Sequence, residues 1–307
     1  MTIELRGVTI RYGKFVAVEG LTVTFAQGTV GLLGRNGAGK SSVLKTMLGL
    51  VRPSAGEVRV RGVDAGKDVD AIRRAVGYMP ERDAHLPGTT GFEMVALLGM
   101  LSGMPPRDAW RRAHEVLYLV GLEEQRYRAV ASYSAGMRQK VKLAAALVHD
   151  PDILFLDEPT NGLDPRDRHT MLELVHRLGS EFGKSVLLST HLLQDVETIC
   201  DAVVVLEAGR VVAQGGVEEL TGRIGREFLL VVEPPSVRLP ERVGAAVVAD
   251  AGPGRYALRF EGGADTAPVL AAVVAAGGRV RSIEPRRRTL SEVFLAAVGG
   301  ESDGRGP

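Results

Sequence analysis

The chain has 307 residues, of which 45% are hydrophobic and 24% charged, and its 38 Lys and Arg side chains nearly balance 37 Asp and Glu. These values are typical of a globular protein with a sizeable buried core and room for two domains, and they exclude disorder of the chain as a whole. A formal net charge of +1 gives no support for a nucleic-acid partner.

The sequence also bears on the compartment. Cys200 is the only cysteine, so an intramolecular disulfide is impossible and a reducing compartment is favoured. Residues 1–14 lack the apolar stretch of a secretory signal. The longest uninterrupted apolar run, Ala267–Ala276, has about ten residues, whereas a membrane-spanning helix needs ~20. We expect a chain that does not cross a membrane by itself but can lie on one through a partner.

Short apolar segments fill the first sixty residues and predict strands at Ile3–Arg11, Val16–Phe25, Thr29–Leu33 and Glu57–Val60. Thr29–Leu33 is an apolar run of the kind found in strands that are buried on both faces. A helix is predicted over Gly39–Leu50, because its apolar residues recur at spacings of three and four.

Between Thr90 and Asp150 the pattern becomes helical, with helices predicted at Phe92–Ser102, Arg107–Val120 and Ala135–His149. Alternation of strands and helices then returns. The predicted strands are Ile153–Leu156, Val186–Ser189 and Ala202–Leu206, and the predicted helices are Arg166–Phe182 and Leu192–Ile199. Such mixed units predict a largely parallel sheet covered by helices.

A domain boundary is predicted near Gly222–Gly225, which separates residues 1–222 from residues 223–307. Composition changes there too, because the last lysine of the chain is Lys184. The second part predicts strands at Phe228–Val232, Ala245–Ala249, Arg255–Phe260 and Arg279–Ile283 and helices at Thr266–Ala276 and Leu290–Val298. We therefore expect a small α+β domain.

The segment Gly34–Ser41, GRNGAGKS, fits the pattern G-x-x-x-x-G-K-[ST] between a predicted strand and a predicted helix. Glycines let backbone N–H groups point at phosphate oxygens, and the helix dipole adds positive potential. Lys40 supplies a charge for the β- and γ-phosphates, and the Ser41 hydroxyl suits Mg²⁺. The candidate nucleotide-binding residues are Gly34, Arg35, Asn36, Gly37, Ala38, Gly39, Lys40, Ser41 and Ser42. An ordinary glycine-rich turn is the alternative.

Two carboxylates, Asp157 and Glu158, end the apolar run from Ile153. Ligands bind at the carboxyl ends of the strands in open α/β sheets, so Asp157 can hold Mg²⁺ and Glu158 can polarise the water that attacks a γ-phosphate. His191 ends another predicted strand at the same edge and can hydrogen-bond the γ-phosphate. The alternatives are an acidic turn and a structural histidine.

Taken in order, these motifs resemble those of the ATP-binding cassette (ABC) ATPases over roughly residues 3–220. Gly34–Ser41 resembles Walker A, and Asp157–Glu158 resembles Walker B with its catalytic glutamate. The resemblance implies an α/β P-loop NTPase fold, in which a mixed, largely parallel sheet is joined by an antiparallel β-subdomain and by a helical subdomain over about residues 90–150. The small α+β domain follows.

Further residues extend the resemblance. Asn161–Asp164 resembles the D-loop through Asp164, His191 resembles the switch histidine, and Tyr12 lies where the family stacks an aromatic ring on adenine. Glu81 occupies the Q-loop position, where most members have glutamine; as an oxygen ligand it could share Mg²⁺ with Ser41 and Asp157. A solvent-exposed Glu81 is the alternative.

The segment Tyr133–Gln139 resembles the family signature Leu-Ser-Gly-Gly-Gln. Ser134 and Gly136 match it, whereas Ala135 and Met137 depart from it. In the family this signature binds the ATP of a second cassette, so the resemblance implies a partner that is a second copy or a related cassette. An ordinary serine N-cap is compatible with the same residues.

The end of the chain adds a shorter resemblance. Leu290–Leu295, LSEVFL, is similar to the closing motif of cassette ATPases from ABC-2-type exporters, which pair with a separate membrane permease. Packing of the small domain explains the helical spacing of the same residues. Arg286–Arg288 is either a solvated charge run or a contact to anionic lipid or to the permease. We expect Cys200 and Trp110 in the core.

The resemblance as a whole implies an ATP-hydrolysing subunit of an ABC transporter, with ATP and Mg²⁺ as cofactors. It would act as a dimer, drive a membrane permease and bind no nucleic acid. It would lie in the cytoplasm, on the inner face of the cell membrane. Export is expected, with import left open. The alternatives are a soluble ABC ATPase that acts on ribosomes or DNA, a P-loop GTPase and a non-catalytic regulator. Gly162 stands where a GTPase motif N-K-x-D needs lysine.

Overall fold

The computed structural model describes residues 2–83, 85–261, 265–287 and 289–299. By their internal contacts they divide into two compact units, one running to Val217 and including the segment from Ala296, the other spanning Glu218–Leu295. The second domain was predicted over residues 223–307, so the division in the structure begins and ends earlier. Whether a separately folding domain begins at residue 223 stays a prediction.

A six-stranded sheet forms the centre of the first unit, in the order β10-β9-β3-β8-β7-β6. Its strands are β3 (Thr29–Leu33), β6 (Val76–Met79), β7 (Ile153–Asp157), β8 (Ser185–Thr190), β9 (Ala202–Glu207) and β10 (Arg210–Gly216). All neighbours are parallel except β10, which runs antiparallel to β9. Every residue of β3, β7 and β8 is buried, which is why each strand contains a short apolar run.

A second, antiparallel sheet has the order β2-β1-β4-β5. Its strands are β1 (Ile3–Tyr12), β2 (Phe15–Phe25), β4 (Ala55–Val60) and β5 (Val63–Asp64). Helix α1 (Lys40–Met47) packs against β1, β2 and β4 of this sheet and against β7 of the central sheet. Val43, Leu44 and Met47 are fully buried there, so α1 is fixed in the common core, with its N-terminus at the end of β3.

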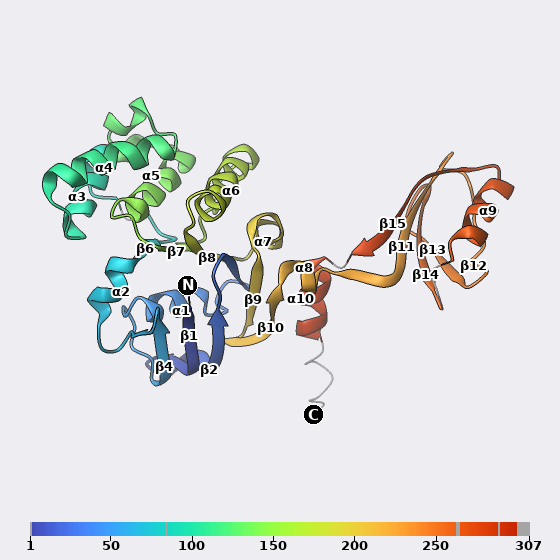
Figure 1. The fold of residues 1–307 in the computed structure, drawn as a ribbon, viewed down its shortest axis with the longest axis horizontal. Helices are drawn as coiled ribbons and strands as arrows, with labels where there is room; N and C mark the ends of the chain where they lie inside the picture. The colour runs from blue at the N-terminus through green and yellow to red at the C-terminus, as the bar shows by residue number, and fades with distance from the viewer. Residues whose placement is uncertain (1, 84, 262–264, 288, 300–307) are drawn as a thin grey trace. The chain divides into compact units, whose positions relative to one another are not determined.

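Three helices, α3 (Gly91–Leu101), α4 (Pro106–Leu119) and α5 (Ala135–Leu147), lie together in the first unit (Figure 1). Thr90 begins α3 with a capping box to Glu93, and Ser134 caps α5 by accepting a hydrogen bond from the Met137 N–H. The remaining helices of the unit are α2 (Val69–Ala75), α6 (Pro165–Ser180) and α7 (Leu193–Ile199). The predicted helical subdomain is therefore present.

Strands β6 and β10 and helix α2 were not predicted. Strand β6 has only four residues, and it packs tightly against α5. A Cβ at Gly77 would lie 2.0 Å from the Ala146 carbonyl oxygen of that helix. Trp110, predicted in the core, is 55% exposed and lies edge-on against Phe92. Cys200 is buried as predicted, and burial raises the pKa of its thiol.

The second unit contains a five-stranded antiparallel sheet in the order β12-β13-β14-β11-β15. Its elements are β11 (Arg223–Glu233), β12 (Arg242–Val243), β13 (Ala246–Asp250), β14 (Arg255–Phe260), α9 (Ala267–Ala275) and β15 (Arg279–Arg287). The short α8 (Val217–Leu220) and α10 (Leu290–Gly299) each include residues of both units. One sheet face packs under α9 through a core that includes Leu230, Phe260 and Val269. The small α+β fold is thus confirmed.

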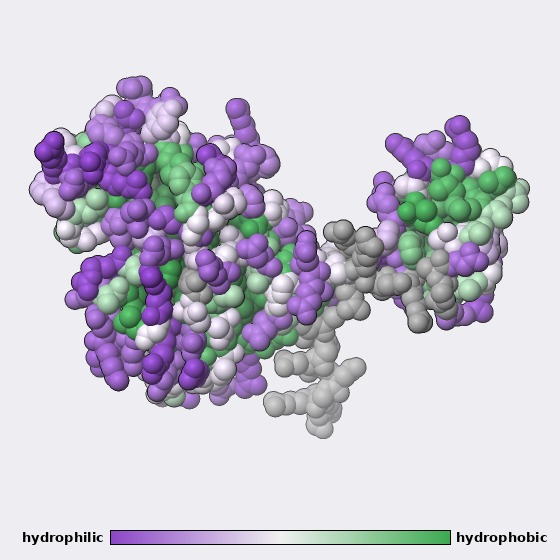
Figure 2. Space-filling model, viewed as in Figure 1, coloured by the Kyte–Doolittle hydropathy of each residue, from purple (hydrophilic) through white to green (hydrophobic). Residues whose placement is uncertain are grey.

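Two features of the surface of this unit stand out. Arg286 forms ion pairs with Glu227 and Glu292, so it is not a free basic residue; Arg288 lies outside the described residues. Apolar side chains gather over α9, where Val274 is 69% exposed (Figure 2). Within the described residues no helix is both long and apolar enough to span a membrane.

Candidate functional site

The loop between β3 and α1 is shaped by two glycines with positive φ, Gly37 at 86° and Gly39 at 104°. A Cβ at Gly39 would lie 2.8 Å from the Ala17 carbonyl oxygen, so a side chain does not fit where the loop passes β2. Gly37 meets nothing within 4 Å and leaves the inside of the loop open. The loop thereby presents the first turn of α1 to a cavity.

That cavity has a volume of about 320 Å³ and gathers most of the predicted nucleotide-binding residues. It is lined by Tyr12, Phe15, Ala17, Asn36, Gly37, Gly39, Lys40, Ser41, Ser42, Glu81 and Glu158. Gly34, Arg35 and Ala38 belong to the same loop but do not line the cavity. The Gly34 carbonyl oxygen accepts a hydrogen bond from Lys40 Nζ.

Sequence reasoning missed Phe15 and Ala17 on the cavity wall. Phe15 pairs directly with Tyr12 across the hairpin of β1 and β2 and is 63% exposed. Pairing the two predicted strands as a hairpin would have placed the Phe15 ring opposite Tyr12 and so identified it. Together the two rings offer apolar surface for a flat base.

Three titratable groups meet at Glu158, which lines the cavity together with Lys40. Lys40 Nζ lies 3.2 Å from Glu158 Oε1, and His191 Nδ1 lies 2.9 Å from Glu158 Oε2. The side chains of Lys40 and Glu158 are each 6% exposed. Glu158 follows β7 with a φ of 50°, and its N–H donates to the Ser189 carbonyl oxygen, which aims the carboxylate away from the sheet. A buried carboxylate is thus held between a cation and an imidazole.

Asp157 ends β7 one residue earlier and is 2% exposed. Its Oδ1 accepts a hydrogen bond of 2.8 Å from the Ser189 hydroxyl. Burial, followed by the charges of Asp157 and Glu81, raises the pKa of the nearby Tyr78 phenol. Tyr78 therefore stays neutral beside the carboxylate over the physiological pH range.

The donor chemistry fits Mg²⁺ only in part. Ser41, Asp157 and Glu81 offer the oxygen ligands that Mg²⁺ prefers, but the described part of the chain holds no cluster of three or more His, Cys, Asp or Glu side chains that could bind a metal ion. Phosphate oxygens of a nucleotide would have to supply further ligands, as Mg²⁺ sites in nucleotide-binding proteins commonly require.

The signature residues lie elsewhere, at the start of α5. Ser134 accepts from the Met137 N–H at 3.2 Å, so the N-cap interpretation holds in the structure. Asp167 packs against Gly136 so closely that a Cβ there would lie 2.2 Å from Asp167 Oδ2. Asp164 caps α6 by accepting from the Asp167 N–H. A side chain at position 136 would therefore have to displace the Asp167 carboxylate.

A glycine-rich loop between a parallel strand and a helix, with acidic residues at the end of a neighbouring strand, defines a P-loop nucleotide-binding protein. Residues 18–161 match the family described as ABC transporter. The daunorubicin/doxorubicin resistance ATP-binding protein DrrA of Streptomyces peucetius is 35% identical over 99% of this chain and 94% of its own length. The Nod factor export ATP-binding protein I of Burkholderia lata is 37% identical over 79% of this chain and 80% of its own.

Among solved structures, the dimeric post-hydrolysis state of the ATP-binding cassette MJ0796, bound to ADP and Pi, is similar with a TM-score of 0.64. The two are 25% identical, over 70% of this chain and 98% of that one. The chain belongs to the ABC transporter family and is an ATP-binding, ATP-hydrolysing member of it. The predictions of the ABC fold, of ATP as ligand and of a transporter ATPase are confirmed.

Glu81 gives a first testable prediction. Glu81→Gln removes a charge but keeps an oxygen, so we expect a modest rise in the Mg²⁺ concentration for half-maximal ATPase; Glu81→Ala removes the oxygen and should have a larger effect. The measurement is ATPase rate against Mg²⁺ concentration for the three chains. Superimposable curves would mean that Glu81 is a solvated loop residue.

Proposed function

We propose that the chain is the ATP-hydrolysing subunit of an exporter, bound to the cytoplasmic face of a separately encoded membrane permease. The observation that carries the ATPase part is the buried contact of Lys40, Glu158 and His191 at the end of the phosphate loop. The printed names of the relatives, a drug-resistance protein and a Nod factor export protein, support the direction of transport.

The cavity suits one orientation of ATP. The base lies against Tyr12 and Phe15, and the phosphates lie along the loop and the first turn of α1, where backbone N–H groups and Lys40 meet their charge. Glu158 accepts a proton from the attacking water, and His191 holds the Glu158 carboxylate in place. Mg²⁺, held by Ser41 with Asp157 and Glu81, would neutralise phosphate charge when bound.

A second cassette completes the site in this proposal. The signature residues begin α5 and do not share the cavity wall with Lys40, so they are free to meet the nucleotide of a partner. Two copies in head-to-tail contact would close two such sites under two-fold symmetry. The dimeric MJ0796 structure supports the formation of a dimer by a similar chain.

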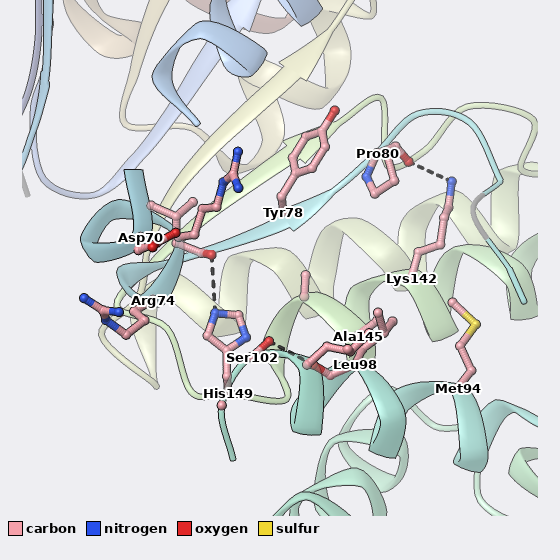
Figure 3. Close-up of a pocket in the computed structure, with 15 residues that line it drawn as sticks. Asp70, Arg74, Tyr78, Pro80, Met94, Leu98, Ser102, Lys142, Ala145 and His149 are labelled. Atoms are coloured by element: carbon pink, nitrogen blue, oxygen red, sulfur yellow. Dashed lines mark hydrogen bonds between the residues drawn. The ribbon is translucent and has the colours of Figure 1, made fainter. Parts of the chain in front are cut away.

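A groove of about 730 Å³ offers a place for the permease. Met94, Leu98 and Leu101 of α3 contribute apolar side chains to its lining. In Figure 3, Met94 and Leu98 lie on the opposite side of the groove from Asp70 and Arg74 of α2. Its shape and mixed lining suit a short amphipathic segment of a membrane protein. The groove lies in the first unit, close to the segment that carries Glu81.

The permease proposal is tested by capture from detergent-solubilised membranes of the source cells. Leu101 is 73% exposed, so Leu101→Glu should fold, hydrolyse ATP as before and recover at least tenfold less of one multi-spanning membrane protein. Leu97→Glu, on the same helix but outside the groove lining, is the control. Equal recovery with both variants would remove the groove from the proposal.

A further inference from the structure

Lys142, in the middle of α5, buries its ammonium group against a loop of the first unit. Its side chain is 4% exposed. Nζ donates to the Pro80 carbonyl oxygen at 3.0 Å and to the Glu81 carbonyl oxygen at 2.9 Å; the first of these bonds is drawn in Figure 3. Asp83 Oδ1 lies 3.7 Å away. A buried ammonium is costly unless it is paired and hydrogen-bonded, so Lys142 and this loop depend on each other.

A second cation from α5 holds the same loop. Arg138, one helical turn before Lys142, places Nε 3.0 Å from Asp83 Oδ2. Its Nη1 donates to the Tyr133 carbonyl oxygen beside the signature. Segment 80–83 is thus fastened to the helix that begins with the signature residues.

The fastened segment borders two cavities. Pro80 and Lys142 line the large groove, and Glu81 lines the nucleotide cavity with Lys40 and Glu158. Burial lowers the pKa of Lys142, while the charges of Asp83, Glu81 and Asp157 raise it. Burial outweighs these charges, so the pKa of Lys142 lies below its usual value.

We propose that Lys142 is a positioning residue for ATP hydrolysis, which holds the Glu81 backbone so that its carboxylate reaches the nucleotide cavity. This inference rests on the proposed function, because Glu81 matters to turnover only if ATP and Mg²⁺ occupy that cavity.

The test compares Lys142→Met with the wild type. Methionine keeps the length and apolar stem of the side chain but has no donor, so segment 80–83 is released while α5 keeps its packing. We expect faster amide hydrogen exchange at Met79 and residues 81–83 and a roughly 10- to 100-fold rise in the Mg²⁺ needed for half-maximal ATPase. Lys140→Met is the control, since Lys140 lines a different hollow with Val120 and Leu174.

Non-additivity separates positioning from a general structural role. In a Glu81→Ala background, Lys142→Met should change the ATPase by less than about twofold, because the residue through which it acts is gone. If Lys142→Met fails to fold, Asp83→Asn loosens the same segment from an exposed position and should shift exchange and Mg²⁺ dependence in the same direction.

Unchanged exchange at Met79 and residues 81–83, or an equally large effect of Lys142→Met in the Glu81→Ala background, would overturn the role of Lys142. A wild-type chain without Mg²⁺-dependent ATPase would instead contradict the proposed function. In that case hydrogen exchange still decides whether Lys142 holds the segment.

Discussion

Glu158→Gln is expected to lower ATP turnover by roughly 10²- to 10⁴-fold while ATP still binds. The amide keeps the size of the carboxylate and a hydrogen bond to His191, which lies 2.9 Å from Glu158 Oε2, but it cannot accept a proton from water. Since the proposed dimer encloses ATP between two chains and the variant cannot hydrolyse that ATP, ATP should also trap the variant as a dimer. Phosphate release under saturating ATP measures the first effect.

Glu173→Gln is the matched control for this prediction. Glu173 lies at an exposed position on α6, so the same Glu-to-Gln change is made there away from the site. Among the described residues, its one ion pair is with His169. Its turnover should equal that of the wild type. Full turnover in Glu158→Gln would show that another group activates the water.

Lys40→Met should weaken ATP binding by roughly 10- to 100-fold, the value of one or two charge-assisted hydrogen bonds. Lys40 lines the nucleotide cavity and supplies a positive charge for the phosphates. Its loss also leaves the buried Glu158 carboxylate without the Lys40 ammonium, which lies 3.2 Å away. Both effects act against an anionic ligand. Titration with a fluorescent ATP analogue measures the change.

Lys45→Met on the exposed face of the same helix is the control for Lys40→Met. It removes one positive charge from α1 without touching the cavity, so its affinity for ATP should stay within about twofold of the wild type. Equal losses in the two variants would mean that only the net charge of the helix matters. The phosphate loop would then not be the binding site.

The sequence predicted those parts of the fold that local pattern determines. The apolar residues of strand Thr29–Leu33 and of helix α1 recur at the spacing typical of a buried strand and of a helix. Both elements were predicted, and the structure contains both. Strand β6 was missed because four residues carry too little pattern, and its place depends on Gly77 meeting α5. Trp110 was misplaced because an aromatic ring on a helix can pack edge-on at the surface as well as inside.

The site was predicted where a motif fixes the geometry. Lys40, Ser41 and Glu158 share one cavity, as the loop-strand spacing indicates. Lys142 could not be predicted, because a lysine in the middle of a helix reads as a solvated residue, and only the tertiary fold reveals the carbonyl groups of Pro80 and Glu81 beside it. Phe15 was missed for a similar reason: its role follows from pairing across a hairpin.

The most direct test of the account is the mass of the Glu158→Gln chain in solution, with and without ATP, by light scattering after size-exclusion chromatography. A second chain adds Ser134→Asp, which keeps an N-cap oxygen for α5 but places a negative charge where a partner's γ-phosphate would bind. The account predicts an ATP-dependent dimer for Glu158→Gln and a monomer that still binds ATP for the double variant. An ATP-dependent dimer of the double variant would contradict a site shared between two chains.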